Sequence, residues 1–154
     1  MRILIVYNTA LDGKSVSGVQ RHFAGVCRHW VAQGHTVDFF VARAAWPVFR
    51  DLCPQAKLIS SDDLFDATGH LGQTWRYFLP YAWRMITGFT AKIPKDYDVV
   101  YACCQAIFET YPSRRIARRI GAALAAKVHH VLDAQGSRAG FFDQLYLLSE
   151  RWSV

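Results

Sequence analysis

Three short segments of this chain are nearly continuous runs of apolar residues: Ile3 to Tyr7, Val37 to Val41 and Val99 to Ala102. A strand with one face in water alternates apolar and polar residues, whereas a strand covered on both faces is apolar almost throughout. These segments therefore predict central strands of a parallel sheet that is buried between two layers of helices.

Two more segments, Lys57 to Ser60 and Lys127 to Val131, also have the composition of strands. Between the strands lie segments with helical spacing. The clearest is a helix that begins near Gly18 and stops at Gly34, a residue that commonly ends helices. Its apolar stripe consists of Val19, Phe23, Val26, Cys27, Trp30 and Val31.

Ser113 is the predicted N-cap of another helix. Ile116, Ile120, Ala123 and Leu124 are predicted to face inward, and Arg114, Arg115, Arg118 and Arg119 to face water. A last helix is expected from about Phe141 to Arg151. This alternation of strands and helices predicts a Rossmann-like, doubly wound parallel sheet in a three-layer α/β/α arrangement with right-handed crossovers.

The 154 residues have the length of one domain, and no internal repeat or linker divides them. The region from Ala44 to Lys95 departs from the regular alternation of strands and helices. It holds the short third strand, a helix candidate punctuated by proline and then a long aromatic helix. An insertion of this kind is a common place for specificity in a Rossmann-like scaffold.

The formal net charge of +6 favours anionic partners without choosing among them. The four cysteines have no ligand spacing, which favours a reduced, cytoplasmic protein. The opening MRILIVY is too short for a secretory signal, and Arg76 and Arg84 interrupt the apolar stretch from Gly72 to Phe89, so that no membrane span is expected.

The loop after the first strand, NTALDGKSVSGVQRH, is long and polar. The backbone N–H groups of Ser17 and Gly18, at the positive end of the following helix, could hold a phosphate, with charge added by Lys14 and Arg21. The alternative is that Ser17 only caps the helix and Gly18 only allows the turn. The spacing matches neither GxGxxG nor the P-loop, which removes support for a nicotinamide dehydrogenase or a P-loop NTPase.

Taken together, MRILIVYN, SGVQRH, QGHTVDFF, YDVVYACCQ, KVHHVLD and SERW resemble, in order and spacing, the N-terminal half of family 4 glycosyltransferases. The resemblance implies the two-domain GT-B fold, in which this chain is a single N-terminal, acceptor-side domain over residues 1–154. The donor-binding C-terminal domain would be absent, and the chain alone would be inactive. Ser17 departs from the glycine usual in the family, and its Cβ narrows the approach of a diphosphate to the backbone.

The resemblance further implies a retaining transfer from a nucleotide sugar, with no cofactor and no metal. His130 matches the cleft histidine that contacts the transferred sugar or the acceptor, and His129 is its neighbour; packing at a strand end is the alternative. Glu109 and Asp133 are candidates to orient acceptor hydroxyls, or are ordinary cap and loop residues. Because adjacent strand residues diverge, a zinc site at the two histidines is not expected.

The expected partners are the donor-binding domain and a sugar or lipid-linked acceptor. The aromatic helix around Trp75 could stack on sugars, lie at a lipid surface or simply pack in the core. The four arginines from Arg114 to Arg119 form a solvated face or give weak peripheral contact with the inner face of the membrane. A stand-alone module that binds a phosphorylated ligand or a protein is the competing function. Nucleic-acid binding has only the net charge in its favour.

Overall fold

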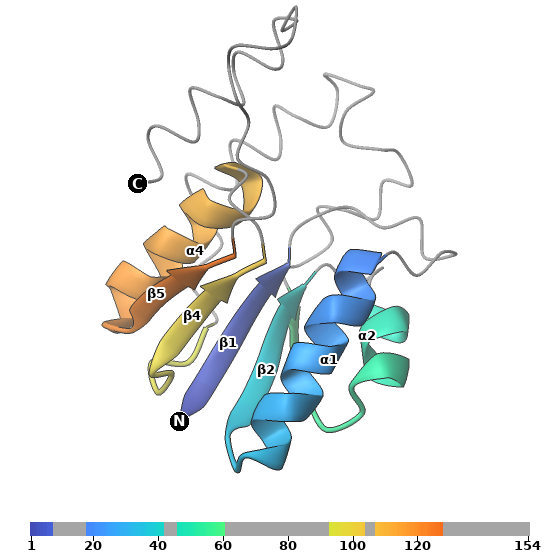
Figure 1. Ribbon diagram of the computed structural model, residues 1–154. Helices are drawn as coiled ribbons and strands as arrows, with labels where there is room; N and C mark the ends of the chain where they lie inside the picture. The colour runs from blue at the N-terminus through green and yellow to red at the C-terminus, as the bar shows by residue number, and fades with distance from the viewer. Residues whose placement is uncertain (8–17, 42–45, 61–92, 104–106, 128–154) are drawn as a thin grey trace, which may run out of the picture.

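Five parallel strands form the centre of the computed structural model, which describes residues 1–7, 18–41, 46–60, 93–103 and 107–127 (Figure 1). The strand order is β3-β2-β1-β4-β5. The strands are β1 (Arg2–Tyr7), β2 (Thr36–Val41), β3 (Lys57–Ser60), β4 (Val99–Ala102) and β5 (Ala123–Ala126). The predicted doubly wound parallel sheet is therefore confirmed, and the first four strands lie within one residue of their predicted bounds.

Helices cover both faces of this sheet, as Figure 1 shows. Helices α1 (Gly18–Ala32) and α2 (Trp46–Leu52) lie on one face, and α4 (Ile107–Ile120) lies on the other. Alternate residues of β1 serve the two layers: Ile3, Ile5 and Tyr7 join the core under α1 and α2, and Leu4 and Val6 join the core under α4. This division explains why β1 is apolar at nearly every position.

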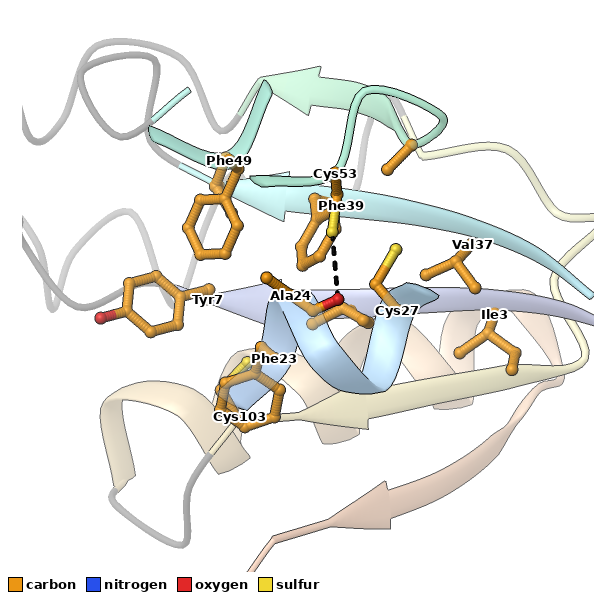
Figure 2. Packing of buried hydrophobic residues seen from close by; sticks show 13 residues of the cluster. Ile3, Tyr7, Phe23, Ala24, Cys27, Val37, Phe39, Phe49, Cys53 and Cys103 are labelled. Carbon is orange, nitrogen blue, oxygen red and sulfur yellow. Dashed lines mark hydrogen bonds between the residues drawn. The ribbon is translucent and has the colours of Figure 1, made fainter. Parts of the chain in front are cut away.

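The core under α1 and α2 is rich in aromatic and cysteine side chains (Figure 2). The Tyr7 and Phe49 rings meet edge to face with their centroids 5.2 Å apart. Cys27 of α1 and Cys53, which follows α2, are both fully buried, and the Cys53 thiol donates a hydrogen bond of 3.4 Å to the Ala24 carbonyl. The described cysteines, Cys27, Cys53 and Cys103, are free thiols.

Helix α1 ends as the sequence predicts. Gly34 has a φ of 83°, a conformation that glycine adopts without steric cost. The N–H of His35 donates to the Trp30 carbonyl at 3.0 Å, which satisfies an acceptor of the last helical turn.

Helix α4 differs from the prediction at both ends. It begins at Ile107, so Ser113 lies inside the helix, fully buried, and is not the N-cap. Pro112 precedes Ser113 within the helix, past its first turn, so the helix continues through a residue that has no backbone N–H to donate. Ile116 and Ile120 pack inward as predicted, and the arginines of α4 are exposed or half-buried.

The fifth strand is also earlier than predicted. Gly121, with a φ of 75°, ends α4, and the chain enters β5 at Ala123. Ala123 and Leu124 therefore belong to a strand and not to a helical stripe. Of the predicted strand Lys127 to Val131, only Lys127 is described, and it follows β5. Alanines have little preference for strands, so pairing with Val99–Ala102 sets the position of this one.

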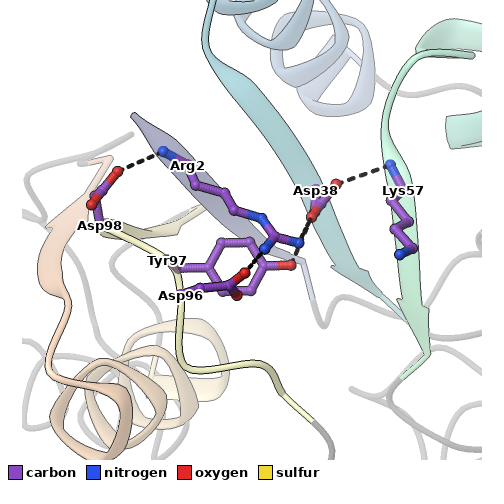
Figure 3. A network of polar contacts seen from close by, with 6 residues as sticks. All are labelled: Arg2, Asp38, Lys57, Asp96, Tyr97 and Asp98. Carbon is purple, nitrogen blue, oxygen red and sulfur yellow. Dashed lines mark hydrogen bonds and ion pairs between the residues drawn. The ribbon is translucent and has the colours of Figure 1, made fainter.

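A polar cluster ties the amino ends of the strands together (Figure 3). Asp38 of β2, buried on the α4 side, accepts hydrogen bonds from the Arg2 guanidinium at 3.2 Å, the Tyr97 hydroxyl at 2.7 Å and the Lys57 backbone N–H at 3.2 Å. Arg2 also pairs with Asp96, and its backbone N–H donates to Asp98 at 2.7 Å. We call Arg2, Asp38, Asp96, Tyr97 and Asp98 the amino-edge cluster.

The amino-edge cluster connects β1, β2, β3 and the segment that enters β4. Burial of a carboxylate is costly unless charged and polar donors surround it, and Asp38 has both. The Tyr-Asp-Val-Val motif that contributed to the family resemblance thus begins with two residues that hold the strands in place, at the edge opposite to the one where ligands of parallel sheets bind.

Candidate functional site

The carboxyl edge of the sheet has its topological switch point between β1 and β4. These strands are hydrogen-bonded neighbours, but the helix that follows β1 lies on one face and the helix that follows β4 lies on the other. The pairing reaches the edge itself, because the Cys103 N–H donates to the Val6 carbonyl at 3.3 Å and the Lys127 N–H donates to the Ala102 carbonyl at 3.1 Å. In open α/β sheets, ligands bind at such a point.

Helix α1 begins with Gly18 and directs its positive end toward this edge (Figure 1). Its first turn has no acidic residue to neutralise the helix dipole. Arg21, exposed in the next turn, adds a positive charge. Backbone N–H groups at a helix start and a nearby guanidinium are suited to an anionic group such as a phosphate.

A groove of about 670 Å³ continues from this edge along α1. One wall consists of α1 residues between Arg21 and Trp30, and the other side consists of Tyr101 of β4 and Lys127 after β5. We call this feature the α1 groove. No sequence pattern predicts this groove, because Trp30 and Tyr101 are distant in the chain and only the pairing of β1 with β4 brings them together.

Two aromatic residues, Trp30 and Tyr101, line the α1 groove, and the buried Phe23 packs against Tyr101. The Tyr101 ring lies between Phe23 and Trp30, with centroid distances of 5.8 and 5.3 Å, both in edge-to-face geometry. The Lys127 ammonium lies 5.6 Å from the centroid of the Phe23 ring. Burial raises the pKa of Tyr101, and the neighbouring Cys103 adds to this effect, so the phenol stays neutral at physiological pH.

The predicted site residues are distributed unevenly over the described chain. Gly18 begins α1 at the carboxyl edge, and Arg21 lines the α1 groove. Glu109 lies in the first turn of α4, which starts from the same edge. Lys14, Ser17, His129, His130 and Asp133 lie outside the described residues, as do the aromatic helix around Trp75 and the helix expected at Phe141 to Arg151.

Within the described ranges, no group of three or more histidine, cysteine or acidic side chains could hold a metal ion. The helices of these same ranges are too short or too polar to cross a membrane.

The geometry defines a class of fold: a Rossmann-like α/β/α domain, of the kind that GT-B glycosyltransferases contain, with a topological switch point between β1 and β4. Two solved glycosyltransferase structures share this fold. The glycotransferase of kitacinnamycin aligns with 81% of this chain at 20% identity and a TM-score of 0.55, and CalG4, the calicheamicin glycosyltransferase, aligns with 96% at 13% identity and a TM-score of 0.59.

The chain spans 29% and 36% of the length of these two structures. No protein-family model matches the sequence, and no curated protein matches it either. The likeness therefore concerns the fold.

Proposed function

We propose that this chain is the acceptor-side domain of a glycosyltransferase of the family 4 type, and that it works together with a donor-binding domain. The observation that carries the proposal is the parallel sheet whose switch point, between β1 and β4, lies beside the start of α1. Two glycosyltransferases contain a domain of the same fold. The catalytic site would form when the donor-binding domain closes over the carboxyl edge.

In this proposal the transfer retains the configuration of the sugar. The acceptor hydroxyl gives its proton to the departing phosphate of the nucleotide sugar, so that no strong base is needed from this domain. His130 would donate a hydrogen bond in the cleft to the transferred sugar or the acceptor, with His129 and Glu109 near the acceptor. The start of α1, from Ser17 and Gly18, would face the diphosphate, with Lys14 and Arg21 adding positive charge.

A titration with a nucleotide diphosphate, followed by NMR of the labelled chain, tests the location of this site. Uridine diphosphate should shift the amides of Gly18 and Arg21 at the carboxyl edge and leave those of Arg2 and Asp38 at the amino edge unchanged. Binding should be weak, with a Kd on the order of 1 mM, because a helix start without the donor domain offers few contacts. Shifts confined to the amino edge, or micromolar binding of a nucleotide sugar to this chain alone, would contradict the proposal.

The competing function is a stand-alone module that binds a phosphorylated ligand or a protein. The α1 groove favours it, since the groove is built within this chain without a second domain. Micromolar binding of a phosphorylated ligand other than a nucleotide sugar, with no transferase partner required, would support this alternative.

A further inference from the structure

The α1 groove is lined by basic side chains, which favour a particular kind of ligand. Arg21 of α1 and Lys127, which follows β5, bring basic side chains to it, and His22 and His29 also line it. Among the described residues that line the groove, none is an aspartate or a glutamate. A positive groove of this kind favours a ligand with an anionic group, since only such a ligand replaces the water around two cations with direct ion pairs.

The rest of the α1 groove is apolar and aromatic. Val26 and Trp30 lie along α1, and the Tyr101 ring, held edge-on by Trp30 and Phe23, lies across from them. Small-molecule sites combine such surfaces with a few charged groups. The α1 groove is wide and open to solvent, so it suits a ligand that lies along its surface.

A glycine in the middle of α1, Gly25, also points to a ligand in the groove. At such a position glycine is the least favourable residue apart from proline. A Cβ built on Gly25 would meet no atom within 4 Å, so packing of the described residues does not require glycine. Gly25 lines the α1 groove, and its missing side chain leaves that groove open.

We propose that the α1 groove binds the acceptor and that the acceptor is an anionic, ring-bearing molecule. Its phosphate or carboxylate pairs with Lys127 and, on the groove side, with Arg21, which borders both the start of α1 and the groove; its ring lies over Val26, Trp30 and Tyr101. The role of this molecule as the acceptor rests on the proposed function, whereas its binding to the groove does not.

Phenyl phosphate is the probe, because it has both an anionic group and an aromatic ring. Inorganic phosphate has only the anionic group, and phenol has only the ring. Binding is followed through the indole N–H resonance of Trp30, identified by its loss in Trp30→Phe. Phenyl phosphate should bind at least about tenfold more tightly than either single-feature probe, since charge and ring contribute separately. Equal affinity for phenyl phosphate and inorganic phosphate, or no shift of the Trp30 resonance, would overturn the proposal.

Substitutions of groove residues test whether phenyl phosphate binds in the groove. Arg21→Ala and Lys127→Ala should each weaken phenyl phosphate binding about tenfold. Arg28→Ala is the matched control, because Arg28 is exposed on the same helix but does not line the groove, and it should change affinity less than twofold. Gly25→Leu should weaken binding at least about tenfold, because its side chain projects into the part of the groove that the ring would occupy, while Gly25→Ala should keep most of the affinity.

The Gly25 variants also distinguish the ligand from another part of the same chain. If Gly25→Leu lowers the Tm by several degrees without any probe and Gly25→Ala does not, the chain itself fills the groove and the ligand proposal is wrong. If phenyl phosphate fails to bind while uridine diphosphate still shifts Gly18, the groove proposal fails and the proposed function stands. If a nucleotide sugar binds tightly and phenyl phosphate binds as expected, the proposed function fails and the groove proposal stands.

Discussion

The Tyr97 hydroxyl donates a hydrogen bond of 2.7 Å to the buried Asp38 carboxylate, across 59 positions of sequence. This contact joins the segment that enters β4 to β2, although the two strands are separated in the sheet by β1. It therefore helps to hold β2 and the start of β4 on either side of β1 at the amino edge of the sheet.

Loss of the Asp38 carboxylate should destabilise the whole domain. Asp38→Ala leaves the Tyr97 hydroxyl and the Lys57 N–H without this acceptor, and leaves the Arg2 guanidinium with only its exposed partner Asp96. We expect a decrease of about 3 kcal/mol in the free energy of unfolding, as for other buried charge partners. Urea denaturation measures it, and Asp51→Ala on the exposed surface of α2 should change it by less than about 0.5 kcal/mol. Equal effects of the two substitutions would refute a structural role for the amino-edge cluster.

Tyr97 should make stability depend on pH in the alkaline range. Burial raises its pKa above the ordinary value of 10.0, and the hydrogen bond to Asp38 adds to this. Below pH 10 the phenol is neutral in both the folded and the unfolded chain. Above pH 10 the unfolded chain loses this proton first, so the free energy of unfolding should fall by up to about 1.4 kcal/mol per pH unit.

The control for this pH effect is Tyr97→Phe, which removes the titrating group but keeps the ring beside Arg2. Other groups titrate in the same range, so the difference between the two proteins is the quantity to measure. Denaturation at several pH values above 10 should give a shallower slope for Tyr97→Phe. Parallel curves would show that Tyr97 ionises equally easily in both states.

Alanine should have opposite effects at two glycines of the same region. At Gly34, with a φ of 83°, a Cβ strains the backbone and should cost roughly 1–2 kcal/mol. At Gly25, inside α1 with open space around the new Cβ, alanine should stabilise the helix by about 1 kcal/mol. Thermal unfolding of the two variants compares them directly, and a loss of stability at Gly25 would show that something else occupies the groove.

Cys27 and Cys53 should resist thiol reagents in the folded chain. Both are fully buried, which denies a reagent access to either sulfur. The hydrogen bond with Cys53 together with burial raises the pKa of the Cys27 thiol, whereas the same hydrogen bond lowers the pKa of the Cys53 thiol, so Cys53 is protected by burial alone. Peptide-resolved mass spectrometry after treatment with a maleimide should find both unmodified without denaturant and both modified in guanidinium chloride. Rapid modification of either residue in the native chain would show that this core opens easily.

The strands show most clearly which parts of the fold the sequence predicts. Continuous apolar runs such as Ile3 to Tyr7 are explained only by burial on two faces, so the parallel sheet follows from them. Gly34 marks a helix end because few other residues adopt its conformation. In contrast, Ala123–Ala126 has no strand signal of its own, and the predicted fifth strand, Lys127 to Val131, lies too late in the chain. The roles of Lys14, Ser17, His129 and His130 stay predictions.

The sequence by itself determined the fold class, the order of the first four strands along the chain, and α1 with its end, because these depend on local composition and periodicity. Tertiary structure alone decided the position of β5, the amino-edge cluster and the α1 groove. Each of these depends on contacts between residues far apart in the chain, such as Asp38 with Tyr97 or Trp30 with Tyr101. No local pattern encodes such contacts, because the pairing of the strands in space creates them.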